Sequence, residues 1–129
     1  AASLGLPTLF HCGDEDFTLP LQIAEAARAV PEAAIILGHM GGYFHTRDAI
    51  RAARQRPNLI LETSAMPYPA MIRAAVDSVG ADRVLFGSDG PGCDPSIEAE
   101  KVRRAGLTPE QEKMLFRTNI ERLLGDAIQ

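Results

Sequence analysis

Short apolar runs typical of β-strands alternate with longer segments of helical periodicity, and this alternation limits the folds open to the chain. The runs cover residues 7–12, 33–39, 58–64 and 82–89, and their apolar cores begin 24 to 27 residues apart. That spacing fits a strand followed by a helix and a loop. The runs are rich in Ile, Leu, Val and Phe without strict alternation, as in parallel strands covered on both faces. We therefore expect four βα units with right-handed crossovers.

Helical segments fill the intervals between the strands. Apolar spacing predicts helices over residues 19–30, 45–56, 68–80 and 95–106, with one or two more over 108–125. The expected N-caps are Thr18, Thr46, Asp94 or Ser96, and Thr108, the last in a capping box with Gln111. A closed barrel of eight βα units takes roughly 250 residues. The pattern therefore leaves two possibilities, a small open α/β sheet or about half of a barrel.

Composition indicates one domain of an ordinary soluble protein. Of 129 residues, 46% are apolar and 23% are charged. The net charge is −4 and no basic stripe is present, so we expect neither nucleic acid nor a membrane as a partner. The opening AASLGLP lacks the features of a signal peptide and an initiator Met, so we expect an internal start. Two cysteines, Cys12 and Cys93, favour free thiols and a cytoplasmic location.

Polar residues suited to metal binding or proton transfer stand at the carboxyl ends of the expected strands. His11 ends the first strand, His39 the second, Glu62 and Ser64 the third, and Asp89 the fourth. Reactive residues gather at this end of parallel α/β folds, so we expect His11, His39 and Asp89 to converge. Imidazole and carboxylate groups are ligands for Zn²⁺, Fe²⁺ or Mn²⁺. Such a site commonly activates water for attack on a substrate.

Each of these residues also has a purely structural interpretation. A lone His at a strand end is more often a hydrogen-bonded residue than a ligand. Asp89 could cap the loop before Pro91. Glu62 is expected to face outward or to pair with an Arg. Cys12 alternates away from His11 along the strand, and we expect it to face the packed side of the sheet.

Five segments carry a resemblance to a known family. They are LFHCG, IILGHMGG, PNLILETS, GADRVLFGSDGP and NIERLLG, in this order, between residues 6 and 125. The chain thereby resembles the amidohydrolase-related family of TIM-barrel metal-dependent hydrolases and decarboxylases. The resemblance implies an α/β fold of strands five to eight of a (β/α)8 barrel, followed by C-terminal helices. Residues 1–129 would then be the C-terminal half of one barrel domain, with the N-terminal half absent.

The resemblance also implies roles for individual residues. His11 corresponds to a metal ligand, and His39 to a ligand or to the acid/base group beside the metal. Asp89 corresponds to a metal ligand that, in hydrolases, also accepts a proton from the attacking water. The implied cofactor is a divalent metal, zinc first, with manganese or iron as alternatives. The paired first-strand ligands of the family have no counterpart in this sequence.

Three functions remain open at this point. The first is a metal-dependent hydrolase acting on an ester, lactone or amide bond of a small-molecule substrate. The second is a non-oxidative decarboxylase of an aromatic or muconate-type acid, for which Arg47 is the nearest cationic clamp in the strand-end loops. The third is a half-barrel without activity. Two unpaired sheet edges would also favour pairing of copies, so we expect a homo-oligomer.

Overall fold

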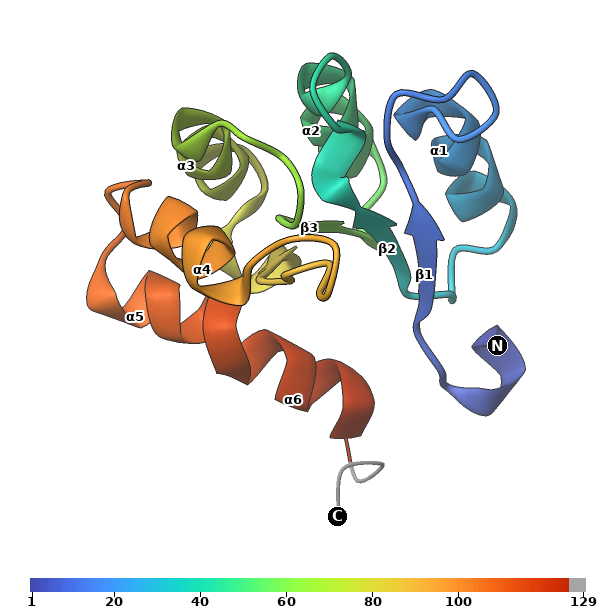
Figure 1. The fold of residues 1–129 in the computed structure, drawn as a ribbon. Helices are drawn as coiled ribbons and strands as arrows, with labels where there is room; N and C mark the ends of the chain where they lie inside the picture. Colours follow the sequence, from blue (N-terminus) through green and yellow to red (C-terminus); the bar gives the residue numbers. More distant parts are fainter. Residues whose placement is uncertain (126–129) are drawn as a thin grey trace.

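A four-stranded parallel sheet forms the centre of the fold (Figure 1). The structure is a computed structural model, and it describes residues 1–125. The strands are β1 (Thr8–His11), β2 (Ile35–Gly38), β3 (Leu59–Glu62) and β4 (Val84–Leu85). They lie side by side in chain order, and every neighbouring pair is parallel. The four βα units expected from the sequence are therefore confirmed.

Helices follow each strand and then close the chain. They are α1 (Pro20–Ala29), α2 (Thr46–Gln55), α3 (Pro69–Val79), α4 (Pro95–Arg103), α5 (Pro109–Lys113) and α6 (Asn119–Leu124). A π-helical turn, Met114–Thr118, joins α5 to α6. Short 3-10 helices cover Ala2–Leu4, His39–Gly41 and Ala81–Arg83. Across residues 1–125, every helix is too short or too polar to cross a bilayer.

Two of the expected N-caps are correct and two are wrong. Asp94 caps α4, and Thr108 forms the expected capping box. Helix α1 begins after Leu19 and not after Thr18, because the Gln22 side chain accepts the hydrogen bond of the Leu19 N–H. Thr46 is the first residue of α2 and not its cap. Its hydroxyl donates backward to the Gly42 carbonyl and so closes the preceding loop.

The two faces of the sheet are covered differently. Helices α1, α2 and α3 lie along one face, as Figure 1 shows, and pack on the larger core. The sheet residues in this core are Ile35, Leu37, Leu59, Leu61 and Val84. The opposite face carries the smaller cluster of Ile36, Ile60 and Leu85, against which Ile120 and Leu123 of α6 pack. Helix α6 does not cover strand β1 on this face, and the β1 residue Leu9 is 61% exposed.

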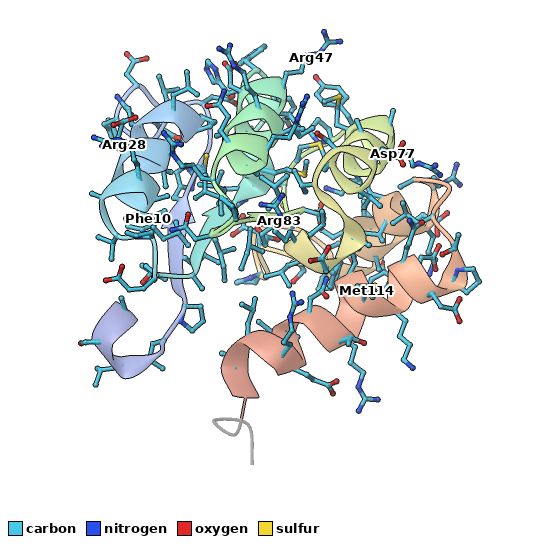
Figure 2. The ribbon with its side chains drawn as sticks, turned by 180° about the vertical axis from the view of Figure 1, so that it is seen from behind. Phe10, Arg28, Arg47, Asp77, Arg83 and Met114 are labelled. Carbon is cyan, nitrogen blue, oxygen red and sulfur yellow. The ribbon has the colours of Figure 1, made fainter. Side chains whose placement is uncertain are left out.

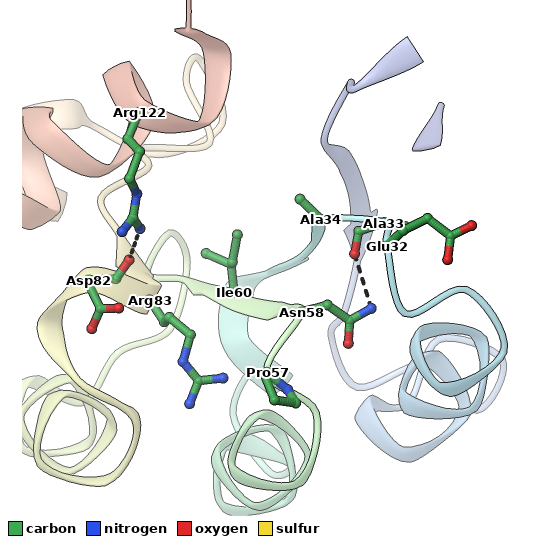
Figure 3. A pocket seen from close by; sticks show the side chains of 9 residues that line it. All are labelled: Glu32, Ala33, Ala34, Pro57, Asn58, Ile60, Asp82, Arg83 and Arg122. Atoms are coloured by element: carbon green, nitrogen blue, oxygen red, sulfur yellow. Dashed lines mark hydrogen bonds between the residues drawn. The ribbon is translucent and has the colours of Figure 1, made fainter. Parts of the chain in front are cut away.

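Three polar side chains satisfy backbone carbonyls at the amino-terminal end of the strands. Asn58 donates to the end of α1 and the turn before β2, and Arg83 donates to carbonyls at the ends of α2 and α3. Asn119, fully buried, donates to the Ala81 and Val84 carbonyls. Figure 2 labels Arg83, and Figure 3 shows Asn58 and Arg83 around a cavity of about 320 Å³ at this end. Asn58 and Arg83 thereby serve as caps that hold the helices on the sheet.

Candidate active site

Strained backbone marks the carboxyl end of the sheet. Among residues 1–125, four non-glycine residues have a positive φ: His39 (65°), Met40 (36°), Ala65 (53°) and Asp89 (51°). All of them lie in the segments that follow β2, β3 and β4. Each such residue costs about 1 to 3 kcal/mol and persists only where its surroundings hold it. Strain of this kind clusters at functional sites.

His11, His39 and Asp89 come together at this end, as the sequence predicts. All three line one cavity of about 460 Å³, and they also line a smaller one of about 200 Å³ beside it. The imidazole rings of His11 and His39 meet edge to face, with their centroids 4.8 Å apart. His39 is half-buried, whereas His11 and Asp89 are exposed. The floor of the larger cavity is apolar and includes Ile36 and Leu85.

Glu62 does not face outward as expected and is not paired with an Arg. It is 6% exposed and lines the larger cavity together with His39. Its carboxylate accepts hydrogen bonds from the backbone N–H groups of His39 (3.1 Å) and Ser64 (2.7 Å) and from the Ser64 hydroxyl (2.8 Å). The expectation was wrong because Leu59 and Leu61 face helices α1 to α3. Alternation along β3 then places Ile60 and Glu62 on the opposite face of the sheet, which the larger cavity adjoins.

The two cavities lined by His11, His39 and Asp89 are called the mouth of the sheet below. The loop after β1 supplies two more carboxylates to the smaller of these cavities. The His11 imidazole donates from Nε2 to Glu15 at 2.7 Å, and this hydrogen bond lowers the pKa of the Glu15 carboxyl. Asp14 accepts from the backbone N–H groups of Tyr43 and Phe44, at 3.1 and 3.0 Å. Asp14 therefore ties the loop after β1 to the loop that follows His39.

A buried ion pair on α4 holds the loop after β3. Glu98 and Lys101 are 2.6 Å apart, with side chains only 7% and 13% exposed. Glu98 accepts from the N–H of Ala65, and Lys101 donates to the Met66 carbonyl at 2.7 Å. These contacts fix the strained Ala65 directly after Ser64. Helix α4 thus supports the loop that reaches His39.

Cys12 lies on the packed side of the sheet, as expected from alternation. It is fully buried, and burial raises the pKa of its thiol to about 12. Cys93, in the loop after Asp89, is free and partly exposed. Neither thiol lines the cavities at the mouth.

The donors at the mouth suit a divalent metal in kind, because they are imidazoles and carboxylates. In residues 1–125, however, no three His, Cys, Asp or Glu side chains are grouped closely enough to hold an ion. His11 Nε2 faces Glu15, so this nitrogen would have to leave its partner in order to coordinate a metal. The chain thus presents part of a donor set.

Comparison with known proteins identifies the family. The model of the amidohydrolase family matches residues 1–125. The chain belongs to the amidohydrolase family. No functionally curated protein matches this amidohydrolase-family chain.

Solved structures similar to this amidohydrolase-family chain are TIM-barrel proteins. An uncharacterized TIM-barrel protein of Bordetella bronchiseptica is 26% identical with a TM-score of 0.85, over 99% of this chain and 48% of that one. A dihydroxybenzoic acid decarboxylase of Polaromonas, with bound manganese and 2-nitroresorcinol, is 19% identical with a TM-score of 0.70, over 95% and 50%. An amidohydrolase of Burkholderia multivorans with bound zinc is 20% identical with a TM-score of 0.68, over 81% and 48%.

The chain spans about half the length of these structures, as the expected half-barrel does. The two lower identities show a shared fold alone. Both decarboxylases and amidohydrolases are among the similar structures, so membership of the family indicates an enzyme without fixing the reaction.

Proposed function

We propose that this chain forms half of the active site of a metal-dependent hydrolase that cleaves an ester, lactone or amide bond of a small molecule. The observation that carries the proposal is the convergence of His11, His39 and Asp89 on one cavity at the carboxyl end of the sheet. His11 and Asp89 would hold a divalent metal, with zinc first and manganese or iron as alternatives. When bound, such a metal supplies Lewis acidity that polarises a carbonyl group and lowers the pKa of water.

The residues of the chain would share the proton transfers. Asp89 is exposed at the mouth and would accept the proton of the attacking water. His39, once protonated at its free ring nitrogen, would stabilise the charge that develops on the substrate oxygen or pass that proton to the leaving group. The apolar floor beneath them would hold the non-reacting part of the substrate.

Absence of a cationic clamp at the mouth supports hydrolysis over decarboxylation. Within residues 1–125, neither of the cavities lined by His39 and Asp89 has a Lys or Arg in its wall. A decarboxylase would use such a charge to hold an acidic substrate. The alternative, decarboxylation of an aromatic or muconate-type acid, is supported by Arg47. It lines a neighbouring cavity of about 340 Å³ that shares Tyr43 with the mouth.

An activity comparison tests the proposal. The protein, loaded in turn with Zn²⁺, Mn²⁺ and Fe²⁺, is assayed for hydrolysis of ester, lactone and amide panels and for CO₂ release from aromatic acids. We expect hydrolysis that Asp89→Asn abolishes without loss of fold. The matched control is Asp77→Asn, which alters an exposed pair on α3 and should leave the rate unchanged. CO₂ release without hydrolysis would favour the alternative, and unchanged turnover in Asp89→Asn would refute the role of Asp89.

A further inference from the structure

We infer that Glu62 is a positioning residue for His39: through Ser64 and the backbone of His39, it holds the imidazole so that Nε2 is the nitrogen free to react. The inference rests on the proposed function for the importance of His39. The hydrogen bonds that support it, however, do not depend on which reaction the site performs.

Two neighbouring glycines leave room in the sheet for the Glu62 carboxylate. The flanking strands have glycines beside it, Gly38 at the end of β2 and Gly87 just after β4. A Cβ atom added to Gly87 would overlap Glu62 Oε1 and would lie 2.5 Å from its Cδ atom. The carboxylate therefore fills space that the neighbouring residue leaves empty, and Gly87 cannot be enlarged while Glu62 stays in place.

Glu62 is held by hydrogen-bond donors and not by a cation. Its Oε1 accepts from the Ser64 N–H, and its Oε2 accepts from the Ser64 hydroxyl and the His39 N–H. Among residues 1–125 no Lys or Arg forms an ion pair with it. A buried carboxylate fixes the direction of each donor that satisfies it, because an unsatisfied buried charge is costly. Both contacts to Ser64 and the contact to His39 are therefore oriented by one group.

The contacts of the His39 ring select one tautomer. Nδ1 lies 3.1 Å from the Ser64 carbonyl oxygen and 3.0 Å from the Ser64 hydroxyl oxygen. A carbonyl oxygen can only accept, and the Ser64 hydroxyl already donates its proton to Glu62. Nδ1 must therefore carry a hydrogen, which leaves Nε2 with the free electron pair in the neutral ring.

Glu62 also fixes the backbone from which the ring projects. His39 has a φ of 65°, a conformation that a β-carbon disfavours, and its N–H donates to Glu62 at 3.1 Å. The ring lines both cavities at the mouth beside His11. Since Nδ1–H is present in both the neutral and the charged ring, Nε2 can gain or lose a proton without breaking the bonds to Ser64.

The tautomer can be measured without substrate or metal. Two-bond ¹H–¹⁵N correlation spectra of the metal-free chain, labelled with ¹⁵N-histidine, distinguish a protonated Nδ1 from a protonated Nε2. His39→Gln identifies the His39 signals. We expect the Nδ1–H tautomer for His39 in the unaltered chain at neutral pH. In Glu62→Gln, whose amide cannot accept all three donors, the Nε2–H tautomer should become clearly populated.

Two further variants make the result decisive. Glu15→Gln is the matched control: it changes the same residue type at a carboxylate that contacts His11, so it should move the His11 signals and leave the tautomer of His39 unchanged. Ser64→Ala removes the hydroxyl that contacts both Glu62 and His39 Nδ1, and it replaces Glu62→Gln as the test variant if Glu62→Gln does not fold. An Nε2–H tautomer in the unaltered chain, or an unchanged His39 in a folded Glu62→Gln variant, would overturn the inference. A protein that has the expected tautomer but hydrolyses nothing would refute only the proposed function.

Discussion

Substitution of Gly87 by Ala tests the packing around the buried carboxylate most sharply. The added methyl group would overlap Glu62 Oε1 and come within 2.5 and 3.1 Å of its Cδ and Cγ atoms. Gly87 does not have a positive φ, so its backbone tolerates Ala. The effect of the substitution is therefore steric, and it falls on the side chain of Glu62.

The expected magnitude follows from the bonds that must break. To make room, Oε1 has to leave the Ser64 N–H, which it accepts at 2.7 Å. A hydrogen bond to a charged group contributes about 1.5 to 3 kcal/mol, and a buried donor left unsatisfied costs about 1 to 3 kcal/mol. We expect Gly87→Ala to lower the free energy of unfolding by about 2 to 5 kcal/mol. This is a large part of the roughly 5 to 15 kcal/mol that stabilises a typical domain.

Urea unfolding followed by circular dichroism measures this loss. Gly90→Ala is the matched control in the same loop, because the nearest atom to its added methyl would be 3.4 Å away. In a Glu62→Ala background the space is open, and Gly87→Ala should cost less than about 1 kcal/mol. An equal cost of Gly87→Ala with and without Glu62, or a cost below about 0.5 kcal/mol in the native sequence, would show that Glu62 does not fill the space beside Gly87.

Three other predictions concern the rest of the chain. Asn119→Ala removes two hydrogen bonds from a fully buried amide and should lower the free energy of unfolding by about 2 to 4 kcal/mol, whereas an unchanged urea midpoint would contradict this. Because burial raises the pKa of Cys12 to about 12, its thiol stays protonated at pH 8. A disulfide reagent should therefore react rapidly with Cys93 alone, and rapid reaction of both thiols would contradict this. The exposed β1 edge should make the chain dimeric or larger in sedimentation at micromolar concentration, with Leu9→Lys shifting it toward monomer; a monomeric native chain would argue against association.

The architecture was predictable because it depends on periodicity. Apolar runs about 25 residues apart, separated by amphipathic segments, specify four βα units whatever their tertiary contacts. The positions of His11, His39 and Asp89 were predictable for the same reason, since residues that end parallel strands share one edge of the sheet. Asp94 and Thr108 were predictable as caps because they bond only within their own first turn.

The support around the site was not predictable from local sequence. Strand β3 reads Leu-Ile-Leu-Glu, and because apolar residues occupy both faces, alternation alone does not say which face Glu62 shares. The contact of Ser64 with His39 spans 25 residues, and the Glu98–Ala65 contact spans 33. Thr18 and Thr46 were expected as caps, but Thr46 bonds to a loop carbonyl and Gln22 caps α1 in place of Thr18. A tertiary or loop contact decided the outcome for Glu62, Ala65 and Thr46, whereas a contact within the first turn of α1 decided it for Thr18.

Zinc binding at the mouth of the sheet is the most direct test of the proposed metal site. Equilibrium dialysis of the purified chain against Zn²⁺, followed by elemental analysis, compares the native sequence with His11→Ala, Asp89→Asn and the control His45→Ala, whose imidazole lies outside the mouth cavities. We expect saturable binding that His11→Ala and Asp89→Asn each weaken and that His45→Ala leaves intact. Zinc binding that is absent, or that survives loss of both His11 and Asp89, would contradict a metal site at this end of the sheet.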